Sequence, residues 1–528
     1  MQLIPQNCRF KLILLAGILF LQLFAKALPP ADLSTVSIIP KPVSLTPSAG
    51  TFTLTNSSSI FFEGHSDGIL NVSKYLAARL SPATGFPMAV KPLNAKPSAG
   101  NIYLKLGQND AQLGDEGYQL TIKHEMITLT ANKPSGLFNG IQTIRQLFPP
   151  KIESSSLQSG PWQIPDGVIC DFPEYSYRGV MLDVARHFFQ IGDVKRYIDL
   201  IALYKMNVMH LHLSDDQGWR IEIKKWPNLT KIGGSSQVGG EKGGFYTQEQ
   251  YTEIVKYAAE RYITIIPEID MPGHINAAMA SYPELNCNNK ATDIYTGTDV
   301  GFSSLCTGKE LTYQFIADVL GEISAITPGP YLHIGGDESH VTKLEDYIPF
   351  VNRVQEIVSK LGKKVIGWDE IALSTLKPNT SVQYWAKAEN AVKGVKQGAK
   401  VIMSPAANSY LDMKYDSTTT LGLHWAGYVE VDQCYNWDPA TLVPGIGKAD
   451  ILGIEAPLWT ETITNMKELE YMVFPRLLGL ADLGWRSPSS GNWNEYKTRL
   501  ASQGERLKAI RINYCPSKLV PWVVPPIR

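Results

Sequence analysis

The chain has 528 residues, of which 44% are hydrophobic and 19% are charged, a composition typical of a globular protein and not of a disordered or fibrous one. Its 49 basic and 50 acidic residues leave a net charge of -1, so no overall field favours nucleic acid or an acidic membrane surface as a partner. At roughly 100–200 residues per domain, the length predicts two or three domains, or one large α/β barrel with an appendage.

Residues 1–27 have the pattern of a secretory signal peptide. Arg9 and Lys11 precede an apolar run over 12–24, and a small-x-small sequence, AKA, follows at 25–27. The run is too short to cross ~30 Å of hydrocarbon as a stable helix, although an uncleaved N-terminal anchor is the alternative. We therefore expect export through the secretory pathway to an extracellular, lysosomal or periplasmic destination, with no membrane span after signal removal.

Export would make the cysteines potential disulfide partners. Cys8 lies in the expected signal, and Cys287 and Cys306 flank a polar loop that a bridge between them would close. The number of remaining cysteines is odd, so at least one thiol should stay free or pair outside the chain; those without an assigned partner are Cys170, Cys434 and Cys515. Glycosylation in a host that performs it would be directed by the N-x-S/T triplets headed by Asn56, Asn71, Asn228 and Asn379.

Residues 28–170 are predicted to form a small α+β domain. They are rich in Ser, Thr, Pro and Gly, with β-like runs at 102–106 and 118–122, and the second run alternates as a half-buried strand does. Apolar residues within 136–147 recur at helical spacing.

From Tyr177 onward, apolar strands alternate with amphipathic helices, which is the pattern of a parallel sheet built from βα units. We expect strands near 178–184, 207–214, 262–269, 331–336, 364–369, 381–386, 400–404 and 451–459. Helices are expected near 193–205, 248–261, 310–325, 343–361 and 467–482. This series predicts a (β/α)8 TIM barrel over 171–505, followed by a C-terminal extension, 506–528, packed on it. No glycine-rich phosphate motif opens a helix, which argues against a nucleotide fold.

Reactive groups of such a barrel lie at the C-terminal ends of its strands, where this chain has carboxylates and tryptophans. Asp337 and Glu338 follow the fourth expected strand, Trp368 lies at the end of the fifth, and Trp459 and Glu461 lie at the end of the eighth. Indole rings stack on the apolar faces of sugars, and carboxylates accept hydrogen bonds from sugar hydroxyls. The pattern favours a carbohydrate ligand.

Asp337 and Glu338 are the most informative pair. Neighbouring side chains on a strand point to opposite faces, so both carboxylates can face one ligand only if the strand ends or twists sharply before them, which Gly335 and Gly336 would permit. Two close acids disfavour double ionisation, so one keeps its proton near neutral pH. The pair would supply a general acid beside an anion, as glycosidic cleavage requires; a solvated acidic turn is the alternative.

Six stretches form an ordered set of motifs along the chain. They are RGVMLDVARH at 178–187, HLHLSDDQGWR at 210–220, PEIDMPGH at 267–274, LHIGGDE at 332–338, GWDE at 367–370 and YW at 384–385. Together they resemble the signature of glycoside hydrolase family 20, the β-N-acetylhexosaminidases. The resemblance covers roughly 35–505 and implies the same architecture, a TIM barrel preceded by a small N-terminal domain.

The resemblance implies substrate-assisted hydrolysis, in which the sugar's own 2-acetamido oxygen attacks the anomeric carbon. Glu338 would protonate the leaving oxygen and then activate water. Asp337 would accept the acetamido N–H and stabilise an oxazolinium intermediate, and Tyr410 would donate to the acetamido carbonyl. The walls around the acetyl methyl would be Trp368, Trp385 and Trp459.

Further residues carry expected roles by the same resemblance. Asp215 and His274 would form a chain behind Glu338 that tunes its proton affinity, and Trp425 would stack on the next sugar outward. Sugar hydroxyls would be fixed by Arg186, with its planar charged fork, and by Asp412 and Glu461.

The implied enzyme is exo-acting and retaining, and removes terminal non-reducing β-linked GlcNAc or GalNAc from oligosaccharides or glycoconjugates. Its expected partner is this carbohydrate substrate, with no metal or cofactor. Dimers are common in the family, so a homodimer is left open.

Several residues in or near the motifs have a structural interpretation. For Trp385 and Trp459, a place in the aromatic core is the alternative to a place in the site. Loop anchors, hydrogen-bond networks and satisfied core positions are the expected places of Arg178, Asp183, His187, Asp216, Asp270, His333 and Asp369.

Two other classes of function remain to be tested. A metal-dependent hydrolase would use His210 and His212, which share a strand face, together with His274 and an aspartate. A glycan-binding protein without catalysis could use the same fold, but pure binding would not require the set Asp337, Glu338 and Tyr410.

Overall fold

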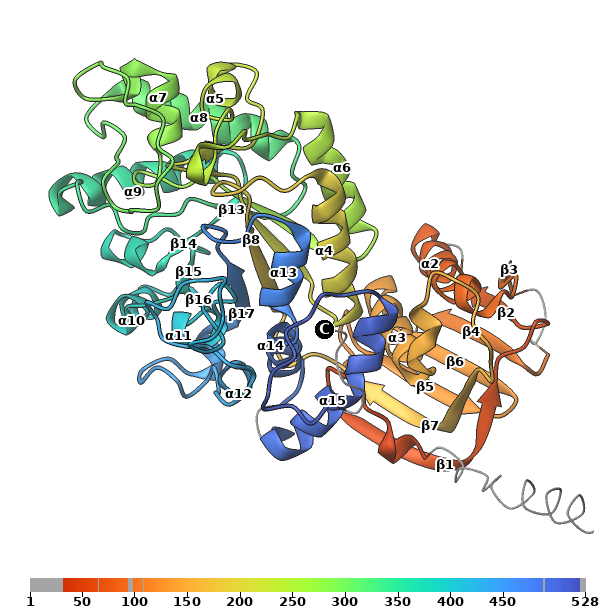
Figure 1. Ribbon diagram of the computed structural model, residues 1–528. Helices are drawn as coiled ribbons and strands as arrows, with labels where there is room; N and C mark the ends of the chain where they lie inside the picture. Colours follow the sequence, from red (N-terminus) through yellow and green to blue (C-terminus); the bar gives the residue numbers. More distant parts are fainter. Residues whose placement is uncertain (1–31, 65, 94–97, 108, 488–489, 523–528) are drawn as a thin grey trace, which may run out of the picture.

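The computed structural model describes residues 32–64, 66–93, 98–107, 109–487 and 490–522. The expected signal peptide, Cys8 and the end of the expected C-terminal extension lie outside these residues. Within them the chain forms a small sheet domain beside a closed barrel, and the last long helix lies between the two (Figure 1).

The small domain is a seven-stranded mixed sheet with two long helices. Its strand order is β1-β7-β5-β6-β4-β2-β3, where β1 is Ser44–Thr53, β2 Ser59–Glu63, β3 Ala89–Pro92, β4 Asn101–Leu106, β5 Tyr118–Lys123, β6 Met126–Ala131 and β7 Gln163–Asp171. The helices are α2, Asp67–Thr84, and α3, Pro134–Leu147. The expected runs at 102–106 and 118–122 and the helix at 136–147 thus appear as β4, β5 and α3.

Helix α3 joins the small domain to the barrel. Every residue from Gly136 to Leu147 is buried, which an amphipathic surface helix would not be. Arg506, on helix α15 (Trp493–Ala509), donates to the carbonyls of Gln146 and Phe148 at 2.9 Å each. These contacts fix the small domain against the outside of the barrel, on the side of α15 (Figure 1).

Eight parallel strands close into the predicted barrel in the order β12-β13-β14-β15-β16-β17-β8-β9. Their bounds are β8 Tyr177–Asp183, β9 Val208–His212, β12 Thr264–Glu268, β13 Tyr331–His333, β14 Lys364–Trp368, β15 Ser381–Tyr384, β16 Lys400–Met403 and β17 Ile451–Leu458. The strands are almost wholly buried because helices cover the outside and side chains fill the inside. A two-stranded ribbon, β10 (Ser214–Asp215) with β11 (Gly218–Trp219), follows β9.

The helices around the barrel are α4 Ile191–Leu203, α6 Gln248–Ala259, α8 Glu310–Ala325, α9 Leu344–Lys360, α10 Ala388–Lys396, α13 Met466–Val473 and α14 Arg476–Trp485. The single helix expected over 467–482 is two helices, because Pro475 lacks the N–H that a continuous helix needs and restricts Phe474 before it. Shorter elements lie in the loops: α5 Asn228–Lys231, α7 Asn276–Ser281, η6 Asp369–Leu373, α11 Ala406–Ser409 and α12 Val431–Tyr435.

The described segment beyond α15 lies against the C-terminal helices of the barrel. The Cys515 amide donates to the Phe474 carbonyl at 2.9 Å, and the Ser517 hydroxyl donates to the Glu430 carboxylate at 2.7 Å.

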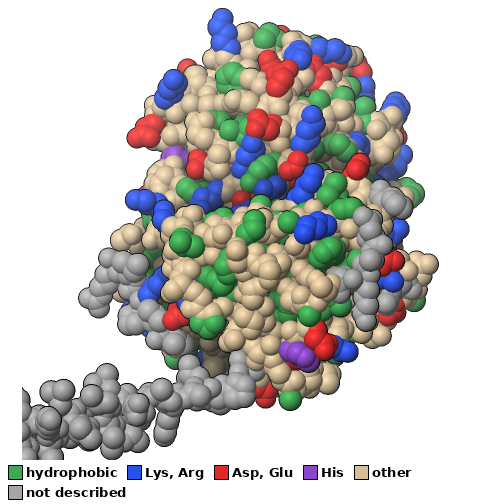
Figure 2. Space-filling view, turned by 90° about the vertical axis from the view of Figure 1, so that its right-hand side faces the viewer, with side chains coloured by type: hydrophobic (Ala, Val, Ile, Leu, Met, Phe, Trp, Pro, Cys, Tyr) green, Lys and Arg blue, Asp and Glu red, His purple; other side chains and the backbone are tan. Residues whose placement is uncertain are grey.

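The surface agrees with the balanced charge of the chain. On the face shown in Figure 2, acidic and basic side chains are interspersed, with neither sign forming a continuous field. Among the described residues, none of the helices combines the length and the apolar character needed to cross a bilayer.

Candidate active site

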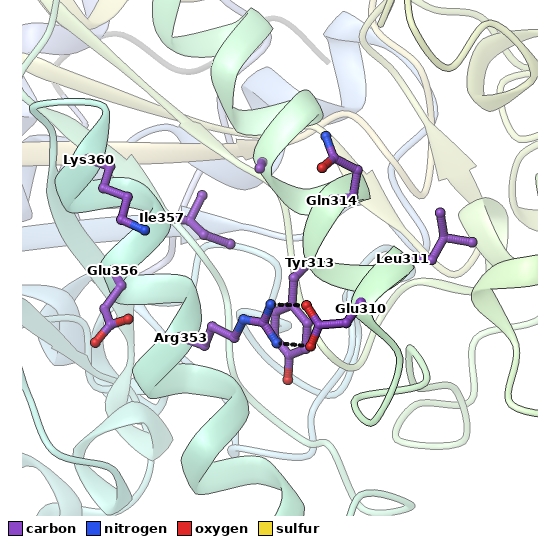
Figure 3. Close-up of a pocket in the computed structure, with 9 residues that line it drawn as sticks. Glu310, Leu311, Tyr313, Gln314, Arg353, Glu356, Ile357 and Lys360 are labelled. Carbon is purple, nitrogen blue, oxygen red and sulfur yellow. Dashed lines mark hydrogen bonds and ion pairs between the residues drawn. The ribbon is translucent and has the colours of Figure 1, made fainter.

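One hollow lies on the outside of the barrel, between α8 and α9 (Figure 3), and has a volume of about 480 Å³. Arg353 from α9 forms an ion pair with both carboxylate oxygens of Glu310 on α8 and lies 3.6 Å above the Tyr313 ring. Because both charged side chains are largely exposed, this pair is a solvated helix–helix contact. All its lining residues belong to α8 or α9, and none lies at the carboxyl end of a strand, where barrel chemistry takes place.

A second cavity, of about 290 Å³, lies at the carboxyl ends of the strands. It is lined by Arg186, His274, Thr298, Val300, Asp337, Glu338, Trp385, Tyr410, Asp412, Leu423, Trp425, Trp459 and Glu461. Of the predicted catalytic and substrate-binding residues, only Asp215 and Trp368 are not in this lining. The cavity therefore brings together groups that span 276 positions of the chain, from 186 to 461.

Two glycines turn Asp337 and Glu338 toward the same cavity. Strand β13 ends at His333, and Gly335 and Gly336 then take φ values of 64° and 101°, which L side chains rarely adopt. A Cβ on Gly335 would lie 1.7 Å from the Asp270 Oδ1 atom, so no other residue fits. Glu338 itself has φ 45°, a strained conformation of the kind found at functional sites. The sharp turn required by the sequence interpretation is present.

His274 bridges the two acids. Its Nε2 atom lies 3.6 Å from the Asp337 Oδ2 atom and 3.4 Å from the Glu338 Oε2 atom. Burial raises the pKa of Asp337 well above its usual value, and the negative charge of Asp270 adds to this shift. Burial would also raise the pKa of Glu338, but the adjacent positive charge of His274 lowers it below its usual value. The pKa values of the two neighbouring carboxyl groups are therefore shifted in opposite directions.

Asp215 lies behind His274, as the sequence interpretation placed it. Its Oδ1 atom is 3.3 Å from the His274 Nδ1 atom, and its Oδ2 atom accepts from Arg186 at 2.7 Å and lies 3.0 Å from His212 Nε2. Burial opposes ionisation of Asp215, but Arg186 and His274 outweigh it and lower its pKa. A permanent negative charge therefore faces the side of His274 that is turned away from the acid pair.

Aromatic rings form one side of the cavity. The Trp385 and Tyr410 rings are nearly parallel, with an interplanar angle of 16° and centroids 6.4 Å apart, and Trp425 meets Trp385 almost edge-on at 5.9 Å. Trp459 lies 6.3 Å from Tyr410. Trp368 is 1% exposed and stands behind Trp459, 5.7 Å from its ring. It supports the wall from below rather than facing the cavity.

The base of the cavity carries charged groups suited to sugar hydroxyls. Arg186, Asp412 and Glu461 all face it, and the Arg186 guanidinium lies 4.7 Å from the centroid of the Trp459 ring. The buried Asp412 Oδ2 atom has no hydrogen-bond partner within the described protein. Burial, together with the neighbouring charge of Glu461, raises the pKa of Asp412. An unpaired buried carboxylate oxygen is costly unless a ligand hydroxyl satisfies it.

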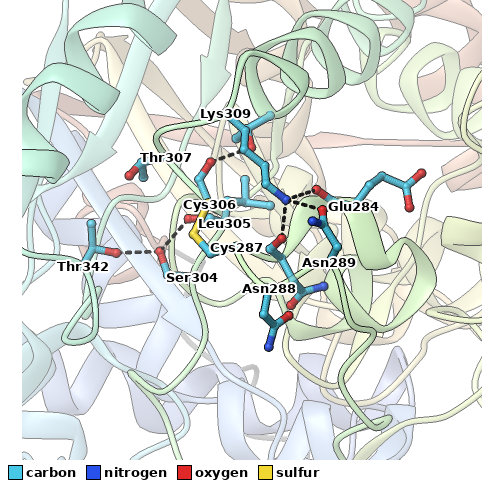
Figure 4. The surroundings of a disulfide bond; sticks show 12 residues. Glu284, Cys287, Asn288, Asn289, Ser304, Leu305, Cys306, Thr307, Lys309 and Thr342 are labelled. Atoms are coloured by element: carbon cyan, nitrogen blue, oxygen red, sulfur yellow. Dashed lines mark hydrogen bonds between the residues drawn. A yellow bond between two sulfur atoms is a disulfide. The ribbon is translucent and has the colours of Figure 1, made fainter.

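The predicted disulfide joins Cys287 and Cys306, whose Cα atoms are 4.9 Å apart (Figure 4). Cys170, Cys434 and Cys515 form no disulfide. The loop closed by the bridge supplies Thr298 and Val300 to the cavity wall. No motif in the sequence marks these two residues; their only signal is their place in a polar loop between two cysteines.

Polar residues that the sequence analysis considered structural do satisfy backbone groups. Asp183 accepts from the amides of Ala185 and Thr460 at 2.8 and 3.0 Å, and Asp369 accepts from the amide of Lys387 at 3.0 Å. Comparable partners are found for Arg178, His187, Asp216, Asp270 and His333.

Glu370 is a site residue that the sequence analysis missed, although it belongs to the GWDE motif. Its Oε2 atom accepts from the Trp385 indole N–H at 3.1 Å, so it holds one wall of the cavity. Burial and the adjacent Asp369 raise the pKa of Glu370 to about 8.

The histidines of the metal-site alternative lie beneath the cavity. His210 and His212 are fully buried, and each has both ring nitrogens within 3.0 Å of a carboxylate oxygen. His274 is the one histidine of that set that lines the cavity. Groups that could hold a cation occur here, among them His210 with Glu268 and His333, but both ring nitrogens of His210 and of His212 already lie against carboxylate oxygens.

Comparison with known proteins gives a consistent result. Residues 175–488 match "Glycosyl hydrolase family 20, catalytic domain", and residues 35–172 match "Glycosyl hydrolase family 20, domain 2". The Beta-N-acetylhexosaminidase of Cellulomonas fimi is 39% identical over 494 residues, covering 93% of this chain and 98% of that protein.

Solved structures agree. The GH20 beta-N-acetylhexosaminidase of Streptomyces coelicolor A3(2) superposes with a TM-score of 0.91 and 48% identity, covering 93% of this chain and 100% of that one. The Streptomyces plicatus N-acetyl-beta-hexosaminidase, solved with Thio-NAglucal, has a TM-score of 0.90 and 48% identity over 94% of this chain and 99% of its own.

The chain belongs to glycosyl hydrolase family 20. It is accordingly a glycoside hydrolase of the β-N-acetylhexosaminidase type, as the six motifs predicted.

Proposed function

We propose that this enzyme removes terminal, non-reducing β-linked GlcNAc or GalNAc with retention of configuration, using the substrate's acetamido group as the nucleophile. The observation that carries the proposal is the convergence of Asp337, Glu338 and Tyr410 on one cavity whose side wall is aromatic and whose base is charged. With its volume of about 290 Å³, the cavity is at the small end of ligand pockets. That size suits one terminal sugar, hence exo-action.

In the first step the acetamido carbonyl oxygen attacks C1, and the bond from C1 to the leaving oxygen breaks as Glu338 gives that oxygen its proton. The intermediate is an oxazolinium, whose N–H is held by Asp337. In the second step the Glu338 carboxylate takes a proton from water while the water oxygen attacks C1. The bond from C1 to the acetamido oxygen breaks, which opens the oxazolinium ring and restores the acetamide. Two displacements at C1 retain its configuration.

The placement of the proton changes on binding. Without substrate, the directions of the two pKa shifts put the shared proton on Asp337 and leave Glu338 ionised beside His274. An acetamido N–H donated to Asp337 favours its ionised form, and displacement of water around Glu338 favours its protonated form. The substrate therefore reverses the order of proton affinity, and His274, within 3.6 Å of both acids, lies where the proton must pass.

Turnover of matched substrates tests this function. Aryl β-GlcNAc and β-GalNAc should be hydrolysed, and aryl β-glucoside, which lacks the acetamide, should not. Glu338→Gln should lose ~10²–10⁴-fold in kcat while binding of GlcNAc survives. Asp337→Asn should lose activity on N-acetyl substrates because the amide of Asn can no longer stabilise the positive intermediate. Full activity in Glu338→Gln would contradict the role of Glu338 as general acid and base and would favour a different reactive centre.

We also propose that the enzyme is exported. The pattern at 1–27 and the Cys287–Cys306 disulfide support this, because disulfides persist in oxidising compartments. N-terminal sequencing of protein recovered outside the cytoplasm should begin near residue 28; recovery of the full N-terminus from a membrane fraction would favour an uncleaved anchor.

A further inference from the structure

A glutamate outside the reacting set lies at the centre of the barrel. Glu268 is the last residue of β12 and is fully buried. Four ring nitrogens face its two oxygens: those of His210 at 2.9 Å, His212 at 2.5 Å, His333 at 2.9 Å and Trp368 at 2.9 Å. Four contacts to one buried carboxylate are more than packing requires, and the mechanism above assigns Glu268 no part.

An unbroken chain of contacts runs from Glu268 to the acid pair. His212 Nδ1 lies 2.5 Å from Glu268, and His212 Nε2 lies 3.0 Å from Asp215. Asp215 lies 3.3 Å from His274 Nδ1, and His274 Nε2 lies 3.4 Å from Glu338. All members except Glu338 are almost completely buried, so charges along the chain are weakly screened.

The geometry determines which residues in this series of contacts are charged. A neutral imidazole has one N–H and one acceptor nitrogen, but both nitrogens of His212 face carboxylates. His212 is therefore a cation between Glu268 and Asp215. His210 also lies between two carboxylates, 2.9 Å from Glu268 and 2.9 Å from Glu455, and its hydrogen bond is to Glu455.

We propose that Glu268 is a positioning residue for the catalytic acid: through His212 it fixes the charge and the orientation of Asp215 and His274, and so sets the pH range in which the Asp337–Glu338 pair works. This inference rests on the role of Glu338 in the proposed function. Glu268 does not contact the cavity and acts only through its neighbours.

The charge of Glu268 affects the proton affinity of the acid pair although Glu268 does not contact either acid. Burial and Asp270 raise the pKa of Asp337 most, and the buried charge of Glu268 adds to the same shift. Burial opposes ionisation of Glu268 itself, but the surrounding histidines hold its pKa well below its usual value, so it carries its charge throughout the working range. Besides Glu268 and the two acids themselves, the charged groups acting on the pair include Arg186, Asp270, His274, His340 and Glu370.

Glu268→Gln removes one negative charge and keeps the shape. His212 retains Asp215 as its carboxylate partner and His210 retains Glu455, so both stay protonated and the cluster becomes more positive. Both acids then ionise more readily, and both limbs of the pH profile of kcat/KM should move to lower pH by about half to one unit.

His212→Gln makes the opposite change, because it removes a positive charge and leaves Glu268 less compensated. Both limbs should move to higher pH by a similar amount. In the double variant the two charges disappear together, and the profile should return close to that of the wild type. Opposite shifts that cancel are the signature of transmitted charge; a structural role would lower activity without moving the limbs in opposite directions.

Glu455→Gln is the matched control. Glu455 is as deeply buried as Glu268 and also contacts His210, but it makes no contact with His212, so its variant should move the limbs less. Thermal melts would show that each variant is folded. If Glu268→Gln does not fold, His212→Gln and the double variant decide the matter. If Glu268→Gln and His212→Gln leave the limbs of the pH profile unmoved, or shift them in the same direction, the role of Glu268 is overturned. If Glu338→Gln is inactive in the same assays, the proposed function still stands.

Discussion

The side chains of Asp337 and Glu338 differ by one methylene, yet their surroundings shift their pKa values in opposite directions. Asp337 is 7% exposed and lies next to Asp270, whereas Glu338 reaches His274 and is partly open to solvent. Since a unit of pKa is 1.36 kcal/mol of differential interaction, the pocket can hold one proton on a defined partner near neutral pH. Division of roles between two carboxyl groups therefore depends on environment and not on residue type.

Glu370 gives a prediction at the scale of a single residue. Glu370→Ala removes the acceptor for the Trp385 indole N–H, so the wall that holds the acetyl group should loosen. One lost hydrogen bond, worth about 1 kcal/mol, should lower kcat/KM on aryl β-GlcNAc by roughly fivefold, mostly through KM. Glu370→Gln keeps an acceptor and should stay near the wild type. Equal losses in both variants would show that the hydrogen bond is not what matters.

The loop between Cys287 and Cys306 is the element that carries the least regular structure into the site. It contributes Thr298 and Val300 to the wall, and beyond the disulfide it is held by hydrogen bonds such as those from Gln217 Nε2 to the Gly297 carbonyl and from Asn276 Nδ2 to the Asp293 carbonyl, each at 2.9 Å. Closing a loop of this length limits the chain entropy of the unfolded state by about 3 kcal/mol in the simplest model.

Removing the bridge should therefore affect stability and substrate binding together. Cys287→Ala with Cys306→Ala should lower the free energy of unfolding by roughly 2–4 kcal/mol and raise KM several-fold, while kcat changes less because Asp337 and Glu338 lie on another loop. Cys170→Ala, which removes an unbridged cysteine, is the control. An unchanged KM in the double variant would mean that the remaining contacts position Thr298 and Val300 by themselves.

At the scale of the whole molecule, the buried titratable groups favour folding in acid. Burial opposes the charge of His210, but Glu455 and Glu268 raise its pKa to about 9, and burial with neighbouring charges raises the pKa of Asp270 to about 7 and of Glu370 to about 8. Each of these values lies above that of the unfolded chain, so from about pH 4 to 9 the folded state binds more protons. These groups outnumber His333, whose pKa burial lowers, so we expect stability to fall as pH rises through this window.

Thermal melts should show this trend. The melting temperature should be highest near pH 5 and fall toward pH 9, with a loss of the order of a few kcal/mol in the free energy of unfolding. Below about pH 4 the lowered pKa values of Glu268 and Asp215 reverse the slope, because those carboxylates lose their ion pairs. Glu370→Gln removes one raised group and should flatten the decline between pH 5 and 8; a melting temperature that rises over that range would contradict the reasoning.

The barrel and the small domain could be predicted from the sequence because each depends on local information, whereas most site residues were assigned through the resemblance of the six motifs to a known family. Apolar runs and helical periodicity mark strands and helices within ten to twenty residues, and the six motifs place reactive groups at strand ends. The turn at Gly335 and Gly336 was likewise predicted from adjacent residues. The Cys287–Cys306 bridge joins the ends of one short loop.

Only the tertiary structure decided which distant residues meet and which protonation states they take. Pairing of β12 with β9 and β13 places Glu268 against histidines of both strands, and the folding of the disulfide-closed loop brings Thr298 and Val300 into the wall. Burial and neighbouring charge, which no local pattern encodes, divide the proton between Asp337 and Glu338. The reason is that sequence spacing determines backbone periodicity, whereas proton affinity depends on solvent access and on charges that lie close only after the chain has folded.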